Sequence, residues 1–222
     1  MTRIARLASD LGRLVRESEM LETVITMMSD DRLAGPAADG TPRVEVIGRL
    51  ADDGFALTRA IQSAMGATEV GQSDGGQPNT GDVRVRFRAA LDAFCAAARD
   101  LETMDADTSI EYRAMTLRPA EVVPQRIAEV VLAHDNLDSV WTIEEADPDS
   151  VLDALEAMIR RIDQHDDIPP LTLATLEGEV WQLNGGGSRV HGTREALAQW
   201  LARGVEDHLQ IDGEVPTLPQ WA

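Results

Sequence analysis

Apolar residues recur every three or four positions in the first part of the chain, which is the spacing of an α-helix with one buried face. The first run covers residues 4–28 and predicts one long amphipathic helix that ends before Gly35-Pro36. The second run covers residues 46–65. Thr41 precedes it as the expected N-cap, and Pro42 suits the first helical position.

Two more helices are predicted further along. Residues 66–82 are rich in Gly, Ser, Asn and Asp, so we expect an exposed, flexible loop there. Apolar spacing then predicts helices over about 83–101 and 119–137, separated by a less regular stretch at 102–117. Four helices of this kind pack most simply as an antiparallel bundle, which we assign to residues 1–140.

The pattern changes in residues 141–222. Pro148 opens another amphipathic helix. Residues 171–176 and 179–183 then alternate between apolar and polar side chains on either side of Glu177-Gly178, which predicts a β-hairpin.

A short strand is expected at Arg189-Val190-His191, followed by a helix that opens at Thr193 and ends at Gly204. Residues 209–213 are typical of a last edge strand. The sequence therefore predicts an α+β protein, mainly α, with a helical bundle followed by a small α+β domain.

Charge narrows the classes of partner. Acidic residues outnumber basic ones 39 to 20, which gives a formal net charge of −19. A field of that sign repels phosphate backbones, so we expect no nucleic-acid partner. The sequence contains no lysine and is rich in Ala, Asp and Arg, a composition typical of a high-GC bacterial source.

No membrane partner is expected either. The N-terminal residues already show helical spacing without a signal-peptide core, and no window approaches the roughly 18–20 apolar residues of a membrane span. We therefore expect a cytoplasmic protein. Cys95 is the single cysteine, which excludes an internal disulfide, and its apolar neighbours favour a buried structural role over that of a nucleophile.

Several motifs near the C-terminus resemble one family. They are Trp181-Gln182-Leu183, Val190-His191-Gly192-Thr193, Trp200-Leu201-Ala202-Arg203 and the closing stretch at 213–221. Together they resemble the C-terminal domain of the mycothiol-dependent maleylpyruvate isomerase family of actinobacteria.

The resemblance continues upstream and covers nearly the whole chain. Residues 30–36 and 43–51 resemble the family's first interhelix loop and second helix, and residues 126–137 resemble its R-x-x-E-V-x-x-H-H-x-D-L helix. The resemblance implies a DinB-like four-helix bundle over residues 1–140 and the family's C-terminal domain over residues 141–222.

The family also implies a divalent metal, usually taken as zinc, that activates the mycothiol thiol. Its ligands are a His on the second helix and a Glu and His four residues apart on the fourth, which leaves an open coordination position. In this chain the three positions carry Arg49, Glu129 and Ala133. We therefore expect the metal position to be vestigial and filled either by an ion pair, with Arg49 turned inward toward Glu129, or by solvent.

Other residues offer only a weaker ligand set. Glu129 and His134 are five residues apart, which turns them about 140° from each other on a regular helix, so a π-bulge would be needed to bring them together. Asp52 or Asp53 would have to complete such a site. The resemblance also places Asn136 where the family has Asp.

The remaining histidines do not add a metal ligand. His165 lies in a hydrophilic run, where a solvated loop is favoured over a metal-binding cluster. His191 at a strand end and His208 near the C-terminus have no helix-paired partners. The leading hypothesis is a metal-free, catalytically degenerate member of the family that binds a small-molecule ligand or a protein partner in a pocket between its domains. The alternatives are a mycothiol-dependent isomerase or S-transferase with an altered zinc or other divalent-metal site, and a structural or regulatory partner of another protein. Periodicity leaves the oligomeric state, including a homodimer, open.

Overall fold

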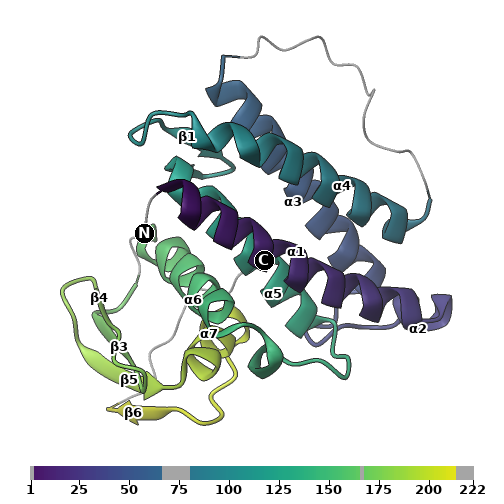
Figure 1. The fold of residues 1–222 in the computed structure, drawn as a ribbon. Helices are drawn as coiled ribbons and strands as arrows, with labels where there is room; N and C mark the ends of the chain where they lie inside the picture. Colours follow the sequence, from purple (N-terminus) through teal and green to yellow (C-terminus); the bar gives the residue numbers. More distant parts are fainter. Residues whose placement is uncertain (1–2, 67–80, 166–167, 214–222) are drawn as a thin grey trace. The chain divides into compact units, whose positions relative to one another are not determined.

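The computed structural model describes residues 3–66, 81–165 and 168–213 (Figure 1). The chain divides into two units, Met1–Thr142 and Ile143–Ala222.

The first unit is built on four long helices. They are α1 (Arg3–Met27), α3 (Arg43–Ala64), α4 (Val83–Ala98) and α5 (Pro119–Asn136). Their inward positions carry aliphatic and aromatic residues that are almost completely buried, among them Leu14, Leu21, Ile25, Ile47, Leu57, Ile61, Phe87, Phe94, Val122 and Ile127. This confirms the helical bundle that the apolar spacing predicts.

The bundle combines two parallel pairs of helices that pack against each other in opposite directions (Figure 1). Asp52 of α3 pairs with Arg86 of α4, and Gly54 lies beside Ala90 further along both helices, so α3 and α4 run the same way. In α1, Glu22 and the carbonyl of Ile25 contact Arg88 and Arg84 of α4 in reverse order, so α1 runs against α4.

The first predicted helix is interrupted. It ends at Met27, and a short helix, α2 (Asp30–Ala34), follows after Ser29. The Ser29 hydroxyl accepts a hydrogen bond from the backbone N–H of Arg32 and caps α2, which explains why the chain restarts a helix there. The expectation of one helix up to Gly35-Pro36 is therefore wrong.

The predicted cap of the second helix is also wrong. Helix α3 begins at Arg43 after Pro42, and no side chain caps it. Thr41 instead donates its backbone N–H to the carboxylate of Asp39 within the preceding turn. The predicted flexible loop at 66–82 lies largely outside the described residues.

A hairpin occupies the stretch that the sequence left irregular. A 3₁₀ turn, Arg99–Glu102, follows α4, and strands β1 (Ile110–Tyr112) and β2 (Met115–Leu117) then pair antiparallel. Ile110, Tyr112 and Leu117 are buried, so one side of this hairpin belongs to the core of the unit.

The second unit is a four-stranded sheet with helices. Its elements are a 3₁₀ turn at Ile143–Glu145, α6 (Pro148–Asp163), β3 (Leu171–Thr175), β4 (Val180–Leu183), β5 (Ser188–Gly192), α7 (Arg194–Arg203) and β6 (Gln210–Asp212). The strand order is β4-β3-β5-β6, with β3 and β5 parallel and the outer pairs antiparallel. The α+β class, mainly α, is confirmed.

Local signals explain the elements of this unit. Thr193 caps α7 by accepting a hydrogen bond from the Ala196 N–H, and Gly204 ends it with a φ of 72°. Leu171, Leu173 and Val190 point to the buried face of the sheet, since residues at alternate positions of a strand share one face. No helix in the described part of the chain is long and apolar enough to cross a membrane.

Candidate functional site

Glu129 lies on α5 at the position where the resemblance implies a metal ligand. Its side chain is only 13% exposed, and both carboxylate oxygens are engaged. Oε1 accepts hydrogen bonds from the Tyr112 hydroxyl at 2.8 Å and from Gln125 Nε2 at 3.3 Å. Oε2 accepts from Arg126 Nη1 at 3.1 Å. The carboxylate is therefore held by three side chains of its own bundle.

Arg126 is the charge that balances Glu129. Its side chain is fully buried, one helical turn before Glu129 on the same face of α5. Nη1 also donates to the backbone carbonyl of Leu50 at 2.8 Å, which ties α5 to α3. A buried guanidinium needs a nearby counter-ion, because an isolated charge is far less stable in the interior than in water. Glu129 supplies that counter-ion.

Tyr112 brings the β1–β2 hairpin to the same carboxylate. Its ring is buried, and burial together with the negative charge and hydrogen bond of Glu129 raises the pKa of the phenol well above its usual range. The hydroxyl therefore stays protonated and acts as a donor. Tyr112 is the only tyrosine in the chain, and no motif around it marks it as a site residue in the sequence.

Arg49 does not make the predicted ion pair with Glu129. Two hydrogen bonds show which residues of α3 lie opposite which residues of α5. Arg43 Nε donates to the carbonyl of Leu137 at 2.6 Å, and Arg126 Nη1 donates to the carbonyl of Leu50. Position 49 therefore lies near the level of Glu129, as the resemblance implies. The Arg49 side chain is nevertheless exposed to solvent, and Arg126 makes the ion pair with Glu129 instead.

The fourth-helix positions 133 and 134 carry no ligand for a shared site with Glu129. Ala133 has no donor atom. His134 is buried and stacks on Trp141, with ring centroids 3.8 Å apart and planes within 2° of parallel. Burial lowers the pKa of His134 to about 3, so the imidazole is neutral over the physiological range.

The two aspartates of the alternative site have other partners. Asp52 forms an ion pair with Arg86 of α4, and Asp53 forms one with Arg113 in the turn of the hairpin. Neither carboxylate joins Glu129 and His134. Within residues 3–66, 81–165 and 168–213, no three His, Cys, Asp or Glu side chains gather closely enough to share a metal ion.

Asn136, the last residue of α5, has a structural role. Its Nδ2 donates to Asp39 Oδ2 at 2.9 Å, and its Oδ1 accepts from the Asp39 backbone N–H at 3.1 Å. Burial opposes ionisation of Asp39, but hydrogen bonds from Thr41 and Asn136 outweigh it and lower the pKa of this carboxyl. The side chain of Asn136 thus anchors the turn that leads into α3.

The remaining candidates are Cys95 on α4 and three histidines of the second unit. Cys95 is half-buried on α4, and burial raises the pKa of its thiol, which lowers its reactivity. His165 follows α6, and His208 lies in the turn before β6. His191 lies on β5 opposite Gln210 of β6.

A divalent metal of the kind that the resemblance implies does not fit these side chains. Such a site needs about three converging donors, usually imidazoles, thiolates or carboxylates. Here a single carboxylate faces a guanidinium at 3.1 Å, and its other oxygen is hydrogen-bonded to a phenol. The positions that would supply imidazoles carry an exposed Arg49 and Ala133.

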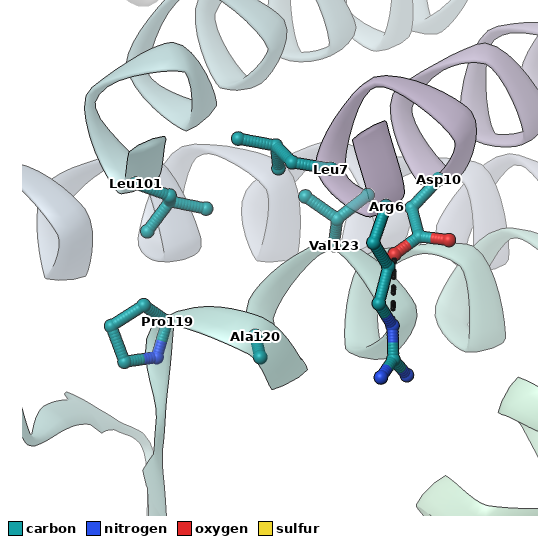
Figure 2. A pocket seen from close by; sticks show the side chains of 7 residues that line it. All are labelled: Arg6, Leu7, Asp10, Leu101, Pro119, Ala120 and Val123. Atoms are coloured by element: carbon teal, nitrogen blue, oxygen red, sulfur yellow. Dashed lines mark ion pairs between the residues drawn. The ribbon is translucent and has the colours of Figure 1, made fainter. Parts of the chain in front are cut away.

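A small recess lies elsewhere in the first unit, between the first turns of α1 and α5 (Figure 2). Its walls are mainly Leu7, Leu101, Pro119, Ala120 and Val123, and an Arg6–Asp10 ion pair of 3.8 Å lies at its edge. The cavity volume is about 30 Å³, enough for only one or two water molecules. This recess is too small for an organic ligand.

No protein-family model matches the chain, and no curated protein matches it either. Two crystal structures of the mycothiol-dependent maleylpyruvate isomerase do match, one of them a His-to-Ala mutant. Each covers 97% of this chain and 97% of its own, with a TM-score of 0.76 and 18% sequence identity. The helical bundle and the C-terminal α+β unit that the motifs predict are thereby found in one solved protein. The chain has the fold of the mycothiol-dependent maleylpyruvate isomerase.

Proposed function

We propose that this chain is a metal-free, catalytically degenerate member of the mycothiol-dependent maleylpyruvate isomerase family that binds a small ligand or a protein partner. The fold and the order of the C-terminal motifs support membership of the family. The strong negative charge of the chain disfavours nucleic acid as the partner. We propose the cytoplasm as its location.

One observation carries the metal-free assignment. Glu129, the single ligand-type residue left at the three implied positions, has both oxygens engaged by Tyr112, Gln125 and Arg126. A metal would have to displace a buried guanidinium and a phenol and would gain one carboxylate ligand in return. That exchange is unfavourable because Arg126 would keep its charge and lose its counter-ion.

The second candidate is a thiol-dependent isomerase or S-transferase with an altered metal site. It requires Glu129, His134 and Asp52 or Asp53 to converge on one ion. The His134–Trp141 stack and the two aspartate–arginine pairs hold these groups away from one another. The geometry therefore supports the metal-free protein better.

The metal content of the purified protein distinguishes the metal-free protein from the metal-dependent enzyme. Protein purified after growth with added zinc or nickel is analysed by inductively coupled plasma mass spectrometry, beside the variants Glu129→Gln and Glu45→Gln. Glu45 is an exposed carboxylate on α3 and serves as the matched control. We expect far less than one metal per chain in all three proteins. Near-stoichiometric metal in the parent and in Glu45→Gln, lost in Glu129→Gln, would overturn the proposal.

A further inference from the structure

Arg126 has more hydrogen-bond donors than the described residues can satisfy. Nη1 donates to Leu50 O and Glu129 Oε2, but Nε and Nη2 have no acceptor within the described part of the chain. The side chain is completely buried, so bulk solvent does not reach these two nitrogens. Buried N–H groups of native proteins are almost always paired with protein or ordered water, and this edge of the guanidinium requires an acceptor.

The two unsatisfied donors lie on the same edge of the guanidinium. The N–H of Nε and one N–H of Nη2 point in parallel, which is the arrangement that lets arginine grip one oxygen or a pair of oxygens. The surroundings of Nη2 are small residues. A Cβ atom placed on Gly54 would lie 2.9 Å from Nη2 and 3.2 Å from the Cβ of Ala90. A side chain at position 54 would therefore displace the guanidinium.

Charge decides what kind of acceptor fits. The Arg126 cation is already balanced by the Glu129 carboxylate, so this pair is neutral as a unit. An added anion would leave a net negative charge in the interior, close to Glu129, and would be repelled by it. A neutral oxygen satisfies both donors without that penalty. Water is the neutral oxygen that a buried polar site ordinarily holds.

We propose that the Nε–Nη2 edge of Arg126 binds one ordered internal water molecule where α3, α4 and α5 meet. This site goes beyond the proposed function and does not depend on metal content. With that water, four of the five N–H groups of Arg126 have an acceptor. The ligand of the proposed function must then be bound by residues other than Arg126.

A crystal structure of the full chain at atomic resolution, grown in bromide, tests the site. We expect one oxygen at about 2.7–3.2 Å from both Nε and Nη2, with no anomalous bromide signal at that position. Three results would overturn the proposal. They are an anomalous bromide peak beside Arg126, no electron density for an oxygen next to Nε and Nη2, and a protein acceptor, such as the Cys95 sulfur, that binds these two nitrogens.

A solution measurement covers the case in which the crystal form is uninformative. In the nuclear magnetic resonance spectrum, the Arg126 Nε–H should show a water cross-peak of the sign given by a long-lived bound molecule. The Gly54→Ala variant should lose that peak because its methyl group displaces Nη2, and Gly48→Ala should keep it, since a Cβ at Gly48 meets nothing within 4 Å. A parent protein without the peak, or a peak that survives Gly54→Ala, contradicts the inference.

Discussion

The hydroxyl of Tyr112 donates a hydrogen bond of 2.8 Å to Oε1 of Glu129 and so joins the β1–β2 hairpin to the bundle. The donor is a buried phenol, and the acceptor is a carboxylate whose charge is balanced by Arg126. A polar bond of this kind contributes more to stability than one at the surface, because its partners have little access to water.

Removal of the Tyr112 hydroxyl should therefore destabilise the protein. We expect Tyr112→Phe to lower the free energy of unfolding by about 1.5–3 kcal/mol, the range for hydrogen bonds to charged groups, as measured by urea denaturation. Thr116→Val is the matched control, since the Thr116 hydroxyl bonds to Glu111 on the exposed side of the same hairpin. Equal losses of unfolding free energy in both variants would mean that the hydrogen bond to Glu129 contributes no more to stability than the exposed one.

Two histidines should create a zinc site beside Glu129. In Arg49→His/Ala133→His, the new imidazoles stand at the level of Glu129 and four residues after it, which is the arrangement of the related metal site. Isothermal titration should show zinc binding that the parent lacks. Adding Glu129→Gln should weaken that binding at least about tenfold, a loss of about 1.4 kcal/mol. A folded double variant that binds no zinc would show that positions 49 and 133 do not face Glu129.

Gly54 and Gly48 should respond in opposite ways to alanine. Both lie inside α3, where alanine is favoured over glycine by about 1 kcal/mol. At Gly54, however, the new methyl group would meet Arg126 Nη2 at 2.9 Å and Ala90 at 3.2 Å, and the resulting overpacking should cost about 1–3 kcal/mol. Thermal unfolding should show Gly48→Ala at or above the parent and Gly54→Ala below it. A stabilised Gly54→Ala would mean that Arg126 moves aside freely.

His134 should make stability fall in acid. The folded protein holds its pKa at about 3 because the imidazole is buried, against 6.5 for a free side chain. Between these values the unfolded chain binds a proton that the folded chain does not, so this contribution is complete above pH 6.5 and is lost as pH falls toward 3. His134→Phe keeps an aromatic ring against Trp141 and should remove up to about 1.4 kcal/mol per pH unit from the slope of unfolding free energy in this window. Parallel pH profiles for parent and variant would refute the assignment.

Elements with local signals were predictable from the sequence. The alternation on both sides of Glu177-Gly178 gave the β3–β4 hairpin, and Thr193 and Gly204 marked the ends of α7. These signals work because hydrogen bonding and backbone preference act within a few residues. The β1–β2 hairpin has no such signal: Arg113, with a φ of 52°, occupies a turn position that usually favours Gly or Asn.

The candidate site was predictable only in part. Glu129 and the level of position 49 followed from the resemblance, but the partner of Glu129 did not. The three-residue spacing of Arg126 and Glu129 on one helix favours Arg126 as that partner, whereas the resemblance pointed to Arg49. Burial decides: Arg126 is enclosed by α3 and α5, whereas Arg49 extends into water, where a long charged side chain is better solvated.

The amide of Asn136 has a consequence for how this turn can change in evolution. Asn136 offers Asp39 both a donor and an acceptor, whereas an aspartate at position 136 would keep the acceptor, lose the donor and bring a second negative charge beside the Asp39 carboxylate. An acid at position 136 would therefore break the bond from Nδ2, and loss of the Asp39 carboxylate would break that bond together with the one from the Thr41 N–H. We expect relatives that carry an acid at position 136 to lack one at position 39, so that the residues at these two positions covary.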